Sequence, residues 1–219
     1  MSTTGDPAGR SWHEVWHAIA KAGDVALTAY QLNQLDGYLD GLIEQNQKLN
    51  LTRIVDRNDA ALKHVADSLT ALKYVPSHAR TLGDVGTGGG VPGAILAIAR
   101  PDLRVTLIDG TKKKLDAVET ICQSIGLKNA RVLHARAESL AKNESKRFDV
   151  VTCRAVGLMP VLLGWCGPLV AKGGLLIALK GPRVVQELAD TRLTNWRYQT
   201  HPVSHPGLDG HLIVTLRRG

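Results

Sequence analysis

A glycine-rich segment with two nearby acids is the part of this sequence best suited to bind a small molecule. The segment reads DVGTGGGVPG over residues 84–93, after an apolar run typical of a buried strand and before a helical pattern. Glycines at such a junction let the backbone approach a ligand closely. A glycine-rich turn with a purely structural role is the less favoured alternative, because strand, loop, helix and a downstream acid occur together.

The segment fits two ligand-binding patterns. The first is an acid followed by alternate glycines, the opening motif of S-adenosylmethionine (SAM)-dependent methyltransferases, formed here by Asp84, Gly86, Gly88 and Gly90. The second is the dinucleotide fingerprint G-x-G-x-x-G, which ends at Gly93, with Asp109 standing 21 residues after Gly88. The two patterns predict different cofactors, SAM and a nicotinamide dinucleotide.

Chemical features of the segment favour SAM. An acid at the loop entrance suits a ligand that carries an ammonium and a sulfonium, and it would repel a pyrophosphate. Under either pattern, Asp109 can accept hydrogen bonds from ribose hydroxyls, the alternative being a cap for the next helix. Glu138, after the third predicted strand, can pair with the adenine edge together with a backbone N–H, or it can simply cap or solvate the following turn.

The elements around these residues predict an α/β fold. From Thr81 onward, short apolar runs alternate with helical stretches, which favours a Rossmann-like, mostly parallel sheet with both faces buried. Two strand-like runs, WRYQTHPVS and HLIVTLRR, close the sequence, and at least one of them should be antiparallel. We therefore expect the seven-stranded sheet of a class I SAM-dependent methyltransferase with an antiparallel C-terminal strand.

The first third of the sequence predicts helices. Apolar residues recur at three-to-four spacing over residues 11–23, 25–49 and 58–74. We expect these helices to form an N-terminal cap over residues 1–76, followed by a SAM-binding domain over residues 77–219.

Charge is distributed unevenly along the chain. Residues 1–99 carry 8 basic and 10 acidic side chains, whereas residues 100–219 carry 19 basic and 10 acidic ones. A basic half favours a polyanionic partner such as RNA, with a merely solvated basic surface as an equal alternative. Three separated cysteines, a polar start and no long apolar run predict a cytoplasmic protein with no membrane span, and we expect no metal site.

The chain resembles the glucose-inhibited division protein B family, bacterial methyltransferases that modify N7 of a guanine in 16S ribosomal RNA. The matching stretches run in order over residues 42–181: Asn50-Leu51-Thr52, His64-x-x-Asp67-Ser68, the glycine segment, Cys153-Arg154-Ala155 and Ala178-Leu179-Lys180-Gly181. The sequence departs from the family in having Gly110 and Cys153 where serine is common.

This resemblance implies roles for particular residues. Gly86 and Val91 would line the SAM pocket, Ala137 and Glu138 would meet the adenine, and Arg154 would lie at the mouth of the active site beside the cofactor. Attack by guanine N7 needs no general base, because N7 carries a lone pair and no proton, so placement of the reactants should supply the catalysis.

Arg154 is the residue that we expect to act in catalysis. It ends the fourth predicted strand, where its donor fork could hold guanine O6, a phosphate or the SAM carboxylate. The alternative is a buried ion pair with Asp149 or Asp84. We expect four further residues to serve substrate binding: Asn50, His64, Asp67 and Lys180. For the first three the alternative is a role in hydrogen bonding within the core, and for Lys180 it is an ordinary surface lysine.

The expected partner is 16S ribosomal RNA within the small subunit or its precursor, bound by a monomer. Few aromatic residues are present, only 4% of the chain, so the RNA should be recognised by shape and phosphates. An NAD(P)-dependent oxidoreductase is the main rival, although no Tyr-x-x-x-Lys occurs. A non-catalytic RNA-binding module with a methyltransferase-like fold is the other.

Overall fold

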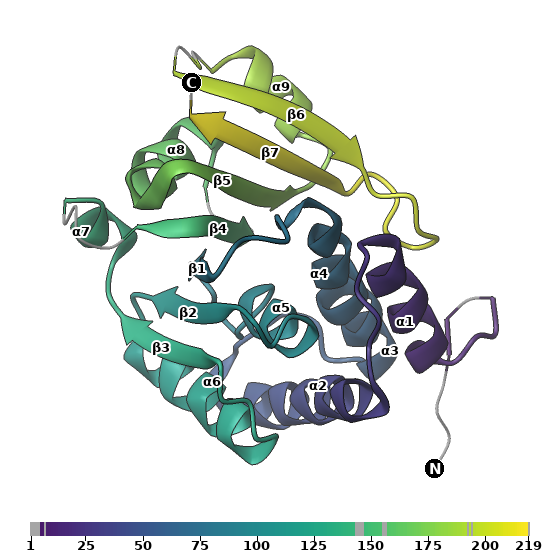
Figure 1. Ribbon diagram of the computed structural model, residues 1–219. Helices are drawn as coiled ribbons and strands as arrows, with labels where there is room; N and C mark the ends of the chain where they lie inside the picture. Colours follow the sequence, from purple (N-terminus) through teal and green to yellow (C-terminus); the bar gives the residue numbers. More distant parts are fainter. Residues whose placement is uncertain are drawn as a thin grey trace.

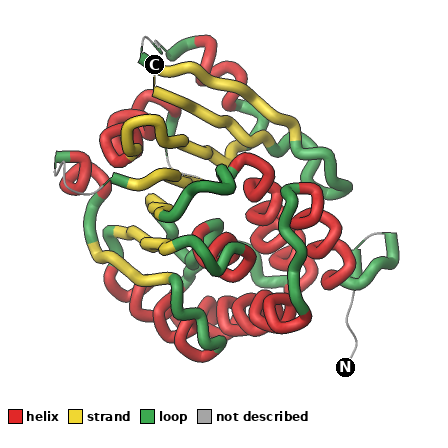
Figure 2. Tube along the Cα trace, viewed as in Figure 1, coloured by secondary structure: helices red, strands yellow, loops and turns green. Residues whose placement is uncertain are grey.

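One sheet organises the part of the chain that the structure describes, with helices on both of its faces (Figures 1 and 2). The computed structural model describes residues 5–6, 8–142, 147–154, 157–191, 193 and 195–218. The strand order is β3-β2-β1-β4-β5-β7-β6; β1 to β5 run parallel, and β7 is antiparallel to both β5 and β6. The predicted class I architecture is confirmed. Its strands are β1 (Thr81–Val85), β2 (Arg104–Asp109), β3 (Ala130–His134), β4 (Phe148–Arg154), β5 (Val170–Lys180), β6 (Trp196–Pro202) and β7 (Leu212–Arg218).

Helices precede the sheet and connect its strands. The connecting helices are α5 (Gly93–Ala99), α6 (Lys112–Ser124), α7 (Ala137–Ala141), α8 (Met159–Cys166), the 3₁₀ turn η3 (Gly167–Leu169) and α9 (Val184–Ala189). Before them, α1 (Trp12–Ala22) and α2 (Ala29–Leu49) confirm the first two predicted helices. The helix α2 begins later than predicted because Thr28 and Gln31 form a capping box that fixes its start.

The third predicted helix is divided into four short segments. These are α3 (Arg57–Ala60), the π-helical turn η1 (Ala61–Ala66), α4 (Asp67–Thr70) and the 3₁₀ turn η2 (Ala71–Tyr74). A π turn inserts an extra residue and shifts the helical register of everything that follows it. His64 lies in this turn and Asp67 directly follows it, so the irregular segment sets where both side chains point.

The two faces of the sheet bury separate apolar cores. One core joins α1 to α6 with Leu82, Val150 and Ile177; the other joins α7, α8 and α9 with Val85, Val151 and Ala178. Neighbouring strand residues therefore alternate between the faces. The N-terminal helices share their core with the sheet, and the division at residue 76 remains a proposal.

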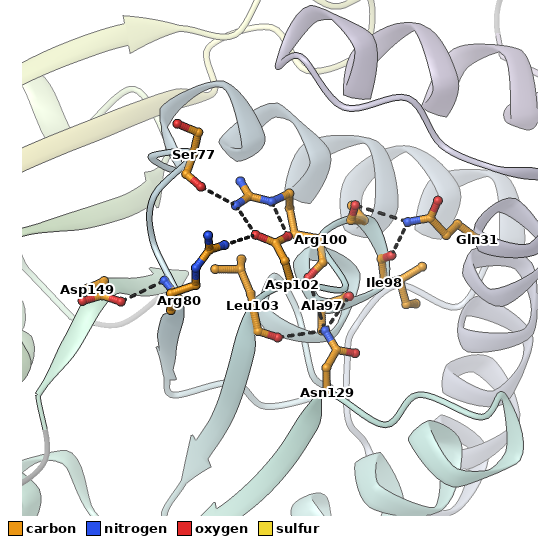
Figure 3. Close-up of polar contacts among 11 residues, drawn as sticks. Gln31, Ser77, Arg80, Ala97, Ile98, Arg100, Asp102, Leu103, Asn129 and Asp149 are labelled. Atoms are coloured by element: carbon orange, nitrogen blue, oxygen red, sulfur yellow. Dashed lines mark hydrogen bonds and ion pairs between the residues drawn. The ribbon is translucent and has the colours of Figure 1, made fainter.

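Polar side chains cover the amino ends of the strands (Figure 3). Arg100 contacts Asp102 through two bonds of 2.8 Å, and Arg80 adds a third of 3.0 Å. The amide of Asn129 donates to the carbonyls of Ala97, Arg100 and Leu103. These contacts satisfy backbone groups where α5 ends and β2 begins.

None of the helices in the described part of the chain is long and apolar enough to span a bilayer.

Candidate active site

The glycine loop is anchored from beneath by Asp84. One carboxylate oxygen accepts from the Thr87 hydroxyl at 2.5 Å and from the Gly93 N–H at 3.0 Å, and the other accepts from the Thr152 hydroxyl at 2.9 Å. Asp84 is fully buried, and this burial raises its carboxyl pKa against the opposing effect of the three hydrogen bonds. Asp84 therefore fixes the loop conformation; a direct contact with a ligand ammonium remains a prediction.

The glycines of the loop serve two different purposes. A Cβ on Gly90 would lie 1.7 Å from the Tyr38 hydroxyl, and one on Gly93 would lie 2.7 Å from the Asp84 Cβ, so both positions are restricted by packing. Gly88 has φ +54°, and a Cβ there would meet only the Gly86 carbonyl, at 4.0 Å. The space over Gly88 is thus open, as a ligand that packs against bare backbone requires. Val91 is buried in the core.

Asp109 connects this loop to the next helix. Its carboxylate accepts from the Gly88 N–H at 3.0 Å and from the Thr111 N–H, just before α6, at 2.8 Å. Because Thr111 precedes α6 and no described side chain bonds to the first N–H groups of that helix, the alternative of a helix cap is wrong. Because Asp109 is only half-buried, it can still serve a ligand, and its contact with ribose remains a prediction.

The predicted adenine-binding residues begin helix α7, beside β3. Ala137 is half-buried and Glu138 is exposed. The preceding Ala135 N–H donates to the Asp109 carbonyl at 3.1 Å, which holds this segment next to the end of β2. The loop, Asp109 and α7 thus follow one another along the carboxyl edge of the sheet, where α/β folds bind ligands.

Arg154 points toward the N-terminal helices. It donates to the Lys63 carbonyl at 2.7 Å and to His64 Nδ1 at 2.9 Å, while the Asp67 carboxylate lies 3.7 Å away. The predicted alternative of an ion pair is therefore confirmed, but its partner is Asp67 and not Asp149 or Asp84. Asp149 lies at the opposite end of β4, where it accepts from the Arg80 N–H and from Thr81.

Neutral acceptors receive the two hydrogen bonds of the Arg154 guanidinium, in addition to its longer ion pair with Asp67. Burial and the nearby guanidinium lower the pKa of His64 to about 3, so His64 is uncharged at neutral pH. Its Nδ1 must accept from Arg154, since a guanidinium only donates, and its Nε2–H then donates to the Thr52 hydroxyl at 2.9 Å. Burial also lowers the pKa of Arg154, and the charges of Asp67 and Asp84 oppose this shift.

A cavity of about 1090 Å³ opens beside Arg154. Its walls are the cap residues His64 and Asp67, the ends of β4 and β5, the start of α8 and helix α9, with largely apolar surfaces such as those of Leu158 and Leu179. A cavity of this size and character can receive a flat base. Among the described residues that line it, none belongs to the glycine loop.

Lys180 lies in the same cavity but is already paired. Its ammonium contacts Glu187 at 2.8 Å and the Gly157 carbonyl at 2.9 Å, and its side chain is only 9% exposed. The alternative of a surface lysine is therefore wrong.

The structure brings most of the predicted substrate residues together, with one exception. His64, Asp67, Arg154 and Lys180 share one cavity. Asn50, the left-handed residue that ends α2, borders a separate hollow with Arg53 and Lys114. His211, directly before β7, and Glu187, in α9, also line the main cavity and were not predicted, because no spacing around them distinguishes them from other residues.

Together, the sheet order, the glycine loop after β1 and the carboxylate at the end of β2 define a class I SAM-dependent methyltransferase. A methyltransferase from Geobacter sulfurreducens has this fold, with a TM-score of 0.57 at 19% identity over 82% of this chain and 89% of its own. So does a ribosomal protein L11 methylase from Lactobacillus delbrueckii subsp. bulgaricus, with a TM-score of 0.52 at 17% identity over 71% and 78% of the two chains.

Sequence comparison identifies the particular family. A family model, GidB, described as rRNA small subunit methyltransferase G, matches residues 31–212. Relatives named ribosomal RNA small subunit methyltransferase G occur in Lactobacillus johnsonii (41% identical over 80% of this chain and 74% of its own) and Lactobacillus acidophilus (43% over 75% and 70%). This chain belongs to that family. The cofactor is therefore SAM, and the dinucleotide interpretation is not retained; binding of SAM by the glycine segment stays a prediction.

Proposed function

We propose that this protein transfers the methyl group of SAM to N7 of a guanine in 16S ribosomal RNA of the small subunit. The observation that carries the proposal is the apolar cavity that adjoins the carboxyl edge of the sheet, with Arg154 fixed at its wall by neutral acceptors. Membership of the family supplies the substrate class.

The cofactor site consists of residues along this edge. Gly86, Gly88, Gly90 and Val91 form the loop against which SAM packs, with Asp84 beneath it. Asp109 accepts the ribose hydroxyls, while Ala137 and Glu138 meet the adenine. Bound SAM supplies a methyl group on a sulfonium, and the protein has only to place the acceptor in line with it.

Arg154 orients the target. Of its five N–H groups, two donate to Lys63 and His64, so the others are available to guanine O6, a phosphate or the SAM carboxylate. The Asp67 carboxylate forms an ion pair with the guanidinium at 3.7 Å, longer than a hydrogen bond, so Arg154 keeps N–H groups that can donate to a substrate. His64 and Asp67 contribute by holding this arginine, and Lys180 by forming the far wall with Glu187.

The substrate context follows from the chemistry of RNA. The basic half of the chain and the scarcity of aromatic side chains favour binding of a folded RNA through its phosphates, as a monomer acting on small subunits in the cytoplasm. Asn50 lies outside the main cavity and would contact RNA that flanks the target.

Borohydride and aniline cleavage tests this function. Small subunits from cells that lack the enzyme are incubated with the protein and methyl-labelled SAM, and the RNA is then cleaved at N7-methylguanosine. We expect one SAM-dependent break, lost in Arg154→Ala. Label without a break would contradict N7 as the acceptor, and failure to bind SAM would contradict the methyltransferase proposal itself.

A further inference from the structure

His211 connects the C-terminal strand pair to the N-terminal helices. It lies directly before β7, 144 residues from Asp67, yet its Nδ1 is 3.0 Å from the Asp67 carboxylate. Since a carboxylate only accepts, Nδ1–H is the donor. His211 also lines the cavity that contains Arg154.

The buried carboxylate of Asp67 is stabilised by this hydrogen bond from His211. Its side chain is 5% exposed, and a buried carboxylate without hydrogen bonds is strongly disfavoured. Arg154 forms an ion pair with this carboxylate at 3.7 Å, a separation longer than a hydrogen bond. Within the described part of the chain, His211 is the hydrogen-bond donor that the structure records for this carboxylate.

We propose that His211 is a positioning residue for methyl transfer: it keeps the ion pair between Asp67 and Arg154 at 3.7 Å, longer than a hydrogen bond, so that Arg154 keeps its bonds to Lys63 and His64 and has N–H groups left for the target nucleotide. The inference rests on the proposed function. In this role His211 acts through Asp67 and Arg154 and does not contact the reacting atoms.

The consequence of removing His211 follows from the chemistry of this cluster. A buried carboxylate that loses its donor moves to the nearest one, and here that is the Arg154 guanidinium. Arginine and carboxylate readily form direct paired bonds, as Arg100 and Asp102 do in the same molecule. Such a pair would draw Arg154 away from His64 and occupy the N–H groups that face the cavity.

This role does not depend on the protonation of His211. The charged groups that face it are Asp67 from α4, Lys63 from η1 and Arg154 from β4; Asp67 raises the pKa of His211, whereas the two cations lower it. Nδ1–H is present in the neutral and the charged imidazole alike, so the positioning should be unchanged across neutral pH.

Three variants test the proposal. His211→Ala removes the donor, and we expect kcat to fall by about tenfold to 100-fold with KM for SAM unchanged, as for a misplaced catalytic group. His211→Asn keeps an N–H donor near the position of Nδ1, and we expect it to restore most of kcat with an unaltered pH profile. His201→Ala is the matched control, because His201 lies in β6 of the same strand pair and contacts Thr215 and Tyr74.

A second readout separates this proposal from the proposed function. The Nε–H resonance of Arg154, followed by NMR in all variants, should shift in His211→Ala, return in His211→Asn and stay unchanged in His201→Ala. An unmoved resonance in His211→Ala would overturn the inference whether or not the protein methylates RNA. A kcat of His211→Asn as low as that of His211→Ala would also overturn it, because the imidazole itself would then be required.

Discussion

The two ends of the sheet both contain arginines and aspartates, but the charges are paired differently. At the amino end, Arg100 and Asp102 bond directly and lie partly in solvent (Figure 3). At the carboxyl end, Arg154 bonds to a carbonyl and a neutral histidine, and its nearest carboxylate stays 3.7 Å away. The amino-end arginines are neutralised by direct hydrogen-bonded pairs, whereas Arg154 has, among the described residues, only the longer ion pair with Asp67 and keeps N–H groups for a substrate.

This difference indicates which end is under functional constraint. A direct ion pair stabilises the fold modestly and leaves no binding capacity. A partly buried guanidinium whose recorded hydrogen bonds go only to neutral groups costs free energy of desolvation that a bound anion or carbonyl oxygen can offset. We therefore expect substitutions at the carboxyl end to change activity and those at the amino end to change stability.

The largest effect is expected for Arg154→Ala. Removing the donor fork should lower the rate of methyl transfer by on the order of 100-fold or more, because fixed charges at a reacting centre contribute at this scale. SAM affinity and the unfolding midpoint should change far less. Single-turnover transfer to small subunits measures the rate, and isothermal titration measures the affinity for SAM. A variant with the wild-type rate would remove Arg154 from the mechanism.

Asp84→Asn should be the next largest, acting through the loop. In the variant the amide NH₂ would replace one of the two oxygens that accept from Thr87, Gly93 and Thr152, so at least one donor would lose its acceptor. We expect this to lower the free energy of unfolding by about 2–3 kcal/mol. SAM binding should weaken together with stability. Urea denaturation with and without SAM would detect this, and unchanged SAM affinity would show that the loop does not need its anchor.

His64 should make the protein acid-sensitive. Its folded-state pKa is about 3, well below the ordinary value of 6.5, so on acidification the unfolded chain binds a proton that the folded one does not. Stability due to neutral His64 is present above pH 6.5 and is lost toward pH 3, by up to about 1.4 kcal/mol per pH unit. His64→Asn does not titrate, so its stability should fall less steeply between pH 6 and 4; parallel curves would contradict the burial of a neutral imidazole.

Asp102→Asn should have the smallest effect. It breaks the pairs with Arg80 and Arg100, but these charges are partly solvated, so a loss of about 1 kcal/mol or less is expected. The hydrogen bond from Arg100 lowers the pKa of Asp102 below its ordinary value of 3.8. The stabilisation from these pairs is therefore present above pH 3.8 and should be lost as the pH falls below that value. Methyl transfer should be unaffected, and reduced transfer at full stability would break the contrast between the two ends.

Sequence reasoning captured the parts of the molecule that obey local rules. Strand and helix periodicity predicted the sheet. The predicted glycine loop and Asp109 do lie side by side, because turn chemistry is encoded in adjacent residues, and their contact with SAM stays a prediction. The π turn at residues 61–66 was missed, since its apolar spacing resembles that of an ordinary helix. Arg154 and His64 are 90 positions apart in the sequence, and Asp67 and His211 are 144 positions apart. A single sequence carries no signal for such distant pairs.

The contrast between the two ends is tested most directly by measuring methyl transfer and unfolding free energy in Arg154→Lys and Arg100→Lys. Lysine keeps the charge but cannot reproduce the planar fork. We predict that Arg154→Lys loses most of its transfer activity at nearly wild-type stability, and that Arg100→Lys loses a little stability at the wild-type transfer rate. Equal transfer rates in the two variants would contradict the assignment of Arg154 to the active site.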